Sequence, residues 1–133
     1  MSFKAKLELD GKVISVLSYM LNVSQQSDLT GRPTASPTAG QLSLTLEMSD
    51  QTKELSRWAL SDKLTKDGKV VFYKDNLSGI MRTIDFKKAF CLKYTENFND
   101  QGINPFVISI LISAEELKLG NDDDAHKNNW PMA

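Results

Sequence analysis

Apolar and polar residues alternate with a period of two over most of the chain, which is the pattern of strands that bury one face. At the N-terminus, lysine or glutamate residues separate Phe3, Ala5, Leu7 and Leu9. Asp10-Gly11 follows as a strong hairpin signal. A long second strand is predicted over 12–26, with a core face of Val13, Ser15, Leu17, Tyr19, Leu21 and Val23 and an opposite face of Ile14, Val16, Ser18 and Met20.

The rest of the chain predicts further strands separated by turns. Leu42, Leu44 and Leu46 mark the apolar face of one strand. The later strands are predicted at 70–74, 80–86, 90–95 and 106–117, with turns at 66–69, 76–79 and 99–102. In the strand at 90–95, one face carries Phe90, Leu92 and Tyr94 and the other carries Cys91, Lys93 and Thr95. About seven short strands with turn signals roughly every 8–12 residues are typical of an antiparallel sandwich or barrel.

The period changes once, after Glu47, where the sequence predicts a helix over about 51–60. Asp50 is a plausible N-cap, and Leu55, Trp58 and Ala59 recur at the spacing of one helix face. A helix of this length is marginal on its own in water, so packing has to hold it. We therefore expect these three residues to pack the helix onto the sheet, with Trp58 as the anchor.

The segment 27–40, SDLTGRPTASPTAG, is a long polar loop between two predicted strands. Loops beyond about 12–15 residues are uncommon in compact domains and tend to be functional or disordered. Pro33 and Pro37 push the residues before them toward extended geometry. Leu29 is almost its only apolar residue, so the loop cannot form a core of its own. We interpret it as a stiff arm that reaches another molecule.

Several predicted strands, at 13–17, 70–73 and 106–112, are apolar on both faces. A small barrel has one interior, and one short helix covers only part of its outside. The remaining apolar surface predicts contact with a neighbouring subunit. The alternative is a two-layer fold that covers all of this surface internally.

Composition narrows the function further. The chain has 133 residues, the size of one domain, and a net charge of −1, which gives no basic surplus for binding nucleic acid. Its single cysteine, Cys91, excludes an internal disulfide. The N-terminal segment has no apolar core of a signal peptide, and no apolar run is long enough to cross a membrane. We expect a cytoplasmic protein that is exported, if at all, without a cleaved leader.

Candidate chemistry is sparse, and we predict no catalytic, cofactor or metal site. Asp122, Asp123, Asp124 and His126 match neither a zinc pattern nor an EF-hand loop. Cys91 needs a histidine to act as a nucleophile, and His126 is the only one in the chain. Two alternatives stay open: a hydrolase that uses Cys91 or His126, and a monomeric barrel that binds an apolar ligand. Against the second, Phe72, Phe90, Ile108 and Ile110 are expected to fill the interior.

Four segments together resemble one family from end to end: MSFKAKLELDGK, SQQSDLTGRPTASPTAGQLSLTLE, KDGKVVFYKD and FCLKYTENFNDQGINPFVISILISAEELKLGN. The family is the tube protein of the bacterial type VI secretion system, called Hcp or TssD. The resemblance implies an antiparallel β-barrel of two sheets with one flanking helix. It also implies a structural rather than enzymatic role, in which subunits form rings, usually hexameric, that stack into a hollow tube.

The family resemblance also implies partners and an interface. A contractile sheath drives the tube out of the cell, so sheath, spike and baseplate proteins are expected partners, together with secreted effectors that the ring can chaperone. In the family, the loop between the second and third strands contacts the next ring. Carried over to this chain, the stacking residues are Thr30, Gly31, Arg32, Pro33, Thr34, Ser36 and Pro37. Arg32 could instead be an ordinary exposed loop charge.

We predict one barrel domain over 1–120, including the arm and the helix, followed by a polar tail over 121–133. The tail is polar except for Trp130, Pro131 and Met132. Trp130 is expected to dock on a barrel, either its own or that of a neighbour.

Overall fold

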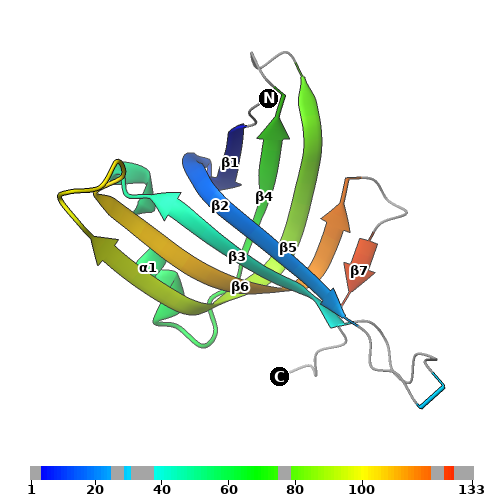
Figure 1. The fold of residues 1–133 in the computed structure, drawn as a ribbon. Coiled ribbons are helices and arrows are strands. Elements are labelled where there is room, and N and C mark those ends of the chain that lie inside the picture. The colour runs from blue at the N-terminus through cyan, green and yellow to red at the C-terminus, as the bar shows by residue number, and fades with distance from the viewer. Residues whose placement is uncertain (1–3, 25–28, 31–37, 75–78, 121–124, 128–133) are drawn as a thin grey trace.

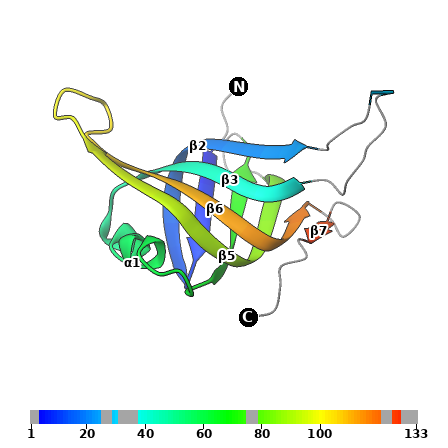
Figure 2. The same ribbon diagram turned by 90° about the horizontal axis from the view of Figure 1, so that it is seen from below.

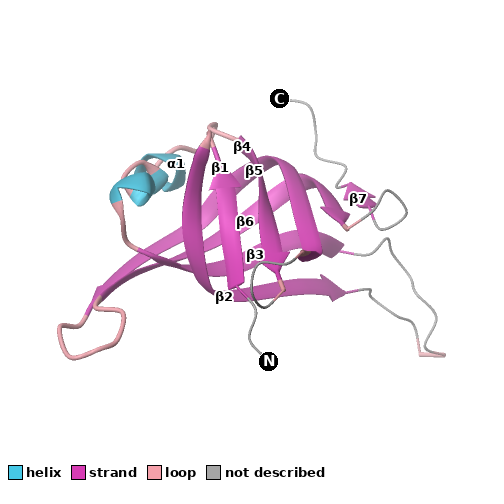
Figure 3. Ribbon diagram, turned by 90° about the horizontal axis from the view of Figure 1, so that it is seen from above, coloured by secondary structure: helices cyan, strands magenta, loops and turns pink. Residues whose placement is uncertain are grey.

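A computed structural model describes residues 4–24, 29–30, 38–74, 79–120 and 125–127. Its strands are β1 (Lys4–Leu9), β2 (Lys12–Ser24), β3 (Thr38–Glu47), β4 (Lys66–Tyr73), β5 (Ile80–Phe98), β6 (Phe106–Leu119) and β7 (Ala125–Lys127). A 3-10 turn, η1 (Asp50–Thr52), and a short helix, α1 (Leu55–Ala59), lie between β3 and β4. Figure 1 shows these elements along the chain, and Figure 3 shows how strands dominate the fold.

The strands form an antiparallel barrel, which confirms the predicted fold class. Their order is β3-β2-β1-β4-β5-β6-β7, and β3 also pairs with β6, so β1 to β6 close on themselves. β2 pairs with β1 over its first half and with β3 over its second half. β5 likewise pairs with β4 from Ile80 to Ala89 and with β6 from Ile84 to Phe98. The long strands β2 and β5 thus belong to two sheets at once, β2-β3-β6-β5 and β2-β1-β4-β5.

A bulge in β2 makes the predicted core face wrong for its first half. Ile14 is buried, whereas Val13 and Leu17 are 50% and 41% exposed. The register shifts between Val16 and Ser18, and an extra residue in one strand reverses which side chains face inward. Beyond the shift, Tyr19 and Leu21 pack against the core, as the prediction had it.

The region after the helix also departs from the predicted turns and strands. Residues 66–69 are not a turn but the start of β4, and 80–86 and 90–95 belong to the single strand β5. Two register shifts lie in this part of β5, one against β4 between Phe86 and Ala89 and one against β6 between Cys91 and Lys93. After the first, Ala89 and Cys91 face the core and Leu92 is exposed, which reverses the predicted faces of residues 90–92. After the second, Tyr94 packs against the core. At 70–73, Val71 is buried as well as Val70, so this strand does not offer the apolar outer face that was predicted.

The predicted helix over 51–60 is shorter and differently capped. Ser49, not Asp50, is the N-cap, and its side chain forms a capping box with Thr52. A 3-10 turn follows, and only 55–59 is α-helical. Leu55 and Trp58 are buried and Ala59 is partly buried against the core. The indole Nε1 of Trp58 donates a hydrogen bond of 2.9 Å to the carbonyl of Ala89 in β5, and Figure 2 shows α1 beneath this strand.

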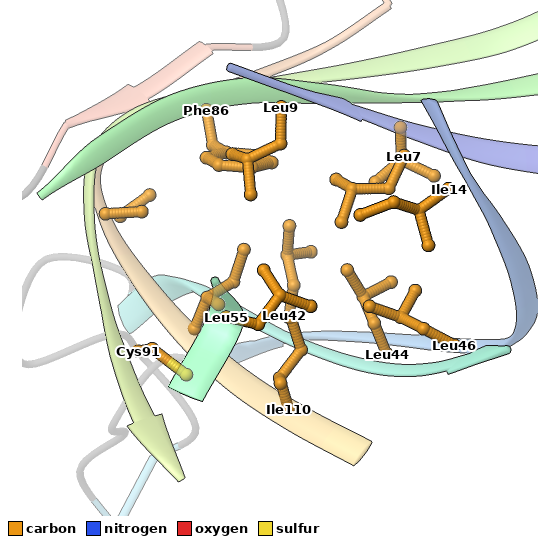
Figure 4. Close-up of a cluster of buried hydrophobic side chains, with 14 of the residues drawn as sticks. Leu7, Leu9, Ile14, Leu42, Leu44, Leu46, Leu55, Phe86, Cys91 and Ile110 are labelled. Atoms are coloured by element: carbon orange, nitrogen blue, oxygen red, sulfur yellow. The ribbon is translucent and has the colours of Figure 1, made fainter. Parts of the chain in front are cut away.

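One hydrophobic core fills the barrel between the two sheets. Leucine, isoleucine and phenylalanine side chains converge on it from both sides, with Leu7, Leu9, Ile14 and Phe86 facing Leu42, Leu44, Leu46 and Ile110 (Figure 4). Ile108 and Ile110 belong to this core, as expected, and Phe72 packs partly buried against it. Phe90 is not among the core residues. Within the predicted polar tail, Ala125–Lys127 forms β7, which pairs with β6.

Candidate assembly interface

The sheet β2-β3-β6-β5 has a free strand edge on each side. Pairing between β1 and β2 ends at Val16 of β2. From residue 17 onward, β3 is the only strand among the described residues that pairs with β2. Pairing with β4 ends at Ala89 of β5, and within the described chain 91–98 pairs only with β6. Unpaired edges expose backbone N–H and C=O groups that readily add a strand from another chain. Figure 1 and Figure 3 show the β5–β6 hairpin extending past the barrel.

Exposed apolar side chains accompany both edges. On the β2 side, Leu17 and Met20 are exposed on the strand itself, and Ile80 and Met81 at the start of β5 are exposed as well. On the β5 side, Leu92 and Phe98 are exposed on the strand, and Ile103 in the following turn is 99% exposed. The sequence predicted exposed apolar surface. The structure places much of it beside two edges on opposite sides of one sheet.

Beside the free edge of β2, the barrel has an apolar mouth. Tyr19, Met20, Leu21, Phe72, Met81 and Arg82 line a pocket of about 350 Å³ there. The rings of Tyr19 and Phe72 meet edge to face, with centroids 4.9 Å apart. Burial raises the pKa of the Tyr19 hydroxyl, and the positive charge of Arg82 partly offsets this rise. The mouth is thus largely apolar, with one guanidinium group near its aromatic lining.

Beside the free edge of β5 lie three aromatic side chains and one carboxylate, which one of the aromatic residues contacts. The hydroxyl of Tyr94 donates a 2.7 Å hydrogen bond to Oε1 of Glu96. Burial raises the pKa of Tyr94, and the hydrogen bond to Glu96 and its negative charge raise it further. Phe98 meets Phe106 edge to face across the hairpin, at 5.8 Å between centroids. This edge therefore presents an aromatic surface that contains a negative charge.

The outer face of the same sheet is rich in hydroxyl groups. A groove of about 480 Å³ crosses it, and its lining includes Ser18, Ser43, Thr45, Thr95 and Ser109, together with Met20, Lys93 and Leu111. The hydroxyls of Thr45 and Ser109 lie 3.4 Å apart across β3 and β6. The lining thus mixes hydroxyl groups with apolar side chains and includes one charged residue, Lys93.

Most of the predicted stacking residues lie outside the described part of the chain. Thr30 is described and exposed, and Leu29 beside it is fully exposed at 108%. Gly31, Arg32, Pro33, Thr34, Ser36 and Pro37 are not described, and neither is Trp130. Their predicted roles therefore stay predictions.

Of the two candidate catalytic residues, Cys91 is not activated as a nucleophile. Cys91 is buried, and burial raises the pKa of its thiol to about 11, whereas a nucleophilic cysteine needs a lowered pKa. His126 lies in β7, opposite Leu117 of β6. Among the described residues, no three histidine, cysteine, aspartate or glutamate side chains gather in a way that could hold a metal ion. Asp122, Asp123 and Asp124 lie outside that set.

Among the described residues, no helix combines the length and the apolar character that a membrane span requires.

Several solved structures share this fold. Hcp1 from Flavobacterium johnsoniae is 29% identical, with a TM-score of 0.84 over 94% of this chain and 99% of that one. Hcp1 from Salmonella typhimurium shares the fold at 15% identity, with a TM-score of 0.74 over 90% of this chain and 86% of that one. The PVC sheath/tube terminator of an extracellular contractile injection system shares it at 17% identity, with a TM-score of 0.61 over 88% and 93%.

The family follows from a match along the sequence. The family model described as hemolysin coregulated protein Hcp (TssD) matches residues 1–131. No curated protein is significantly similar in sequence. The chain therefore belongs to the Hcp (TssD) family, the tube proteins of the type VI secretion system.

Proposed function

We propose that this chain closes into rings by adding the free edge of β5 in one copy to the free edge of β2 in the next. The observation that carries the proposal is the position of these two edges on opposite sides of one sheet. A contact between two different patches generates a ring when the rotation between copies closes. Because each strand in β2-β3-β6-β5 is antiparallel to its neighbour, β2 and β5 run in opposite directions. Rotation about a ring axis preserves these directions, so the new pair is antiparallel.

In such a ring, the sheets of neighbouring copies join into one continuous wall. The barrel core and α1 lie on one side of this wall, and the hydroxyl-rich groove lies on the other. We assign the hydroxyl-rich side to the channel of the tube. A lining of short hydroxyl side chains with little charge gives a transported protein few strong contacts.

Stacking of the rings into a tube is the second part of the proposal. We assign it to the arm at 27–40, with Thr30, Gly31, Arg32, Pro33, Thr34, Ser36 and Pro37 as contact residues, on the basis of family membership. The same basis supports a structural rather than catalytic role. It also supports a cytoplasmic subunit that is exported without a cleaved leader and works with sheath, spike and baseplate proteins and with effectors that ride inside the ring.

The test of ring formation uses the purified chain. We expect a ring-sized species in sedimentation velocity and annular particles in electron micrographs. A species that stays monomeric at high concentration would contradict the proposal.

The arm is tested by deleting 34–38. If the arm contacts the next ring, we expect single rings to persist while tubes no longer grow, as judged by electron microscopy. If the rings are lost as well, the arm serves folding or ring closure instead of stacking.

A monomeric barrel that binds an apolar ligand is the alternative. Its interior is occupied by side chains from both sheets (Figure 4), as in other small barrels. A titration that reveals one stoichiometric site for an apolar dye on a monomer would favour this alternative.

A further inference from the structure

We infer that Glu96 of one copy pairs with Arg82 of the next copy across the ring contact. The inference rests on the proposed ring closure and adds the side chains that set its register. Two strand edges by themselves allow several registers that differ by two residues. A pair of opposite charges favours one of them and penalises the others.

Glu96 lies on the core-facing side of β5, beyond the point where β4 ends. Its cross-strand partner in β6 is Ile108, which is fully buried, and Tyr94 is opposite the buried Ile110. Glu96 is itself exposed, and the described residues offer it no ion pair. Its carboxylate is held in place by the hydroxyl of Tyr94. The free edge thus presents an oriented negative charge between Tyr94 and Phe98.

Arg82 lies beside the other free edge, that of β2, on the opposite side of the sheet from Glu96. It is opposite Phe72 in β4, it lines the apolar mouth, and its charge is close enough to Tyr19 to affect the pKa of that hydroxyl. It is exposed, and none of the ion pairs within the described chain includes it. Within the described residues, the mouth therefore holds a cation without a carboxylate partner.

Strand addition brings the two groups to the same side of the joined sheet. Tyr19 and Leu21 of β2 face the core, as shown by their cross-strand partners Leu44 and Leu42. When β5 of one copy lies beside β2 of the next, its core-facing residues continue this row and reach the mouth. Glu96 then meets Arg82 among the aromatic and apolar side chains of the two edges. Partial removal of water strengthens the attraction between them.

The experiment is a charge exchange in the full chain. Arg82→Glu and Glu96→Arg are made singly and together, and assembly is followed by sedimentation velocity over a series of concentrations, with electron microscopy of the particles. Each single variant places like charges across the contact, so we expect the concentration for half-assembly to rise at least about tenfold. The double variant restores opposite charges and is expected to return within about threefold of the original chain.

Two controls separate assembly from folding and from net charge. Lys63→Glu makes the same charge change as Arg82→Glu at an exposed site between α1 and β4 and is expected to leave assembly unchanged. Thermal unfolding of each variant in the monomeric state reports folding, and both exposed sites are expected to tolerate substitution.

The outcomes distinguish this pairing from the proposed function. If the original chain forms rings but the single variants assemble normally, or the double variant stays as impaired as the singles, the Glu96–Arg82 pair is wrong and ring formation stands. If the original chain forms no rings, the proposed function fails and this pairing fails with it.

Discussion

Replacing Trp58 with alanine is expected to cost about 3–5 kcal/mol of unfolding free energy, the range for deleting a large buried aromatic side chain. Trp58 is fully buried. Its indole Nε1 donates a hydrogen bond to the carbonyl of Ala89, the last residue of β5 that pairs with β4. The helix it anchors is only five residues long and has no stability of its own. Loss of the indole should therefore detach α1 from the barrel. Urea unfolding followed by circular dichroism measures the change.

Two companion variants identify the cause of this effect. Trp58→Phe keeps an aromatic ring but leaves the Ala89 carbonyl without its donor, so we expect an intermediate loss, of which about 1–3 kcal/mol comes from the unsatisfied group. Arg57→Ala alters the exposed neighbour and should change stability by less than about 0.5 kcal/mol. A loss below about 1 kcal/mol in Trp58→Ala would show that the barrel does not depend on its helix anchor.

The second large effect is expected at Gly68, in the middle of β4. A Cβ at this position would lie 2.7 Å from the backbone oxygen of Glu8, 2.7 Å from Cζ of Phe86 and 2.9 Å from Cδ1 of Leu9. Glycine inside a strand commonly marks such a close approach. Gly68→Ala has to displace a backbone atom of β1 as well as two core side chains. We expect a loss of at least about 1–3 kcal/mol in unfolding free energy, the usual cost of overpacking a core.

Gly79→Ala is the matched control, because among the described residues a Cβ there meets only the Cδ atom of Lys74, at 3.9 Å. Its stability should stay close to that of the original chain. Adding Phe86→Leu to Gly68→Ala removes the clash with the ring but not the one with the Glu8 carbonyl. Recovery should therefore be partial. Equal stability of the Gly68→Ala and Gly79→Ala variants would contradict the close approach.

The sequence predicted the positions of most strands and the helix anchor because both depend on local spacing. The alternation at Leu42, Leu44 and Leu46 indicated a strand with one buried face, and all three residues are buried. The spacing of Leu55 and Trp58 indicated one helix face, and both are buried. The helix ends were less predictable, since Ser49 and Thr52 cap a 3-10 turn through side-chain contacts that helical periodicity does not reveal.

By itself, then, the sequence determined an antiparallel sandwich or barrel with one packed helix and an excess of apolar surface. Its motifs determined the family, whose resemblance implied the barrel. The faces of β2 and β5 were decided only by the tertiary structure, because a bulge in each strand shifts the period of two without leaving a signal in the pattern. The positions of the free strand edges were also decided only by the tertiary structure. An edge is free where a neighbouring strand stops, as β1 does beside Val16 and β4 beside Ala89, and that depends on how all the strands align.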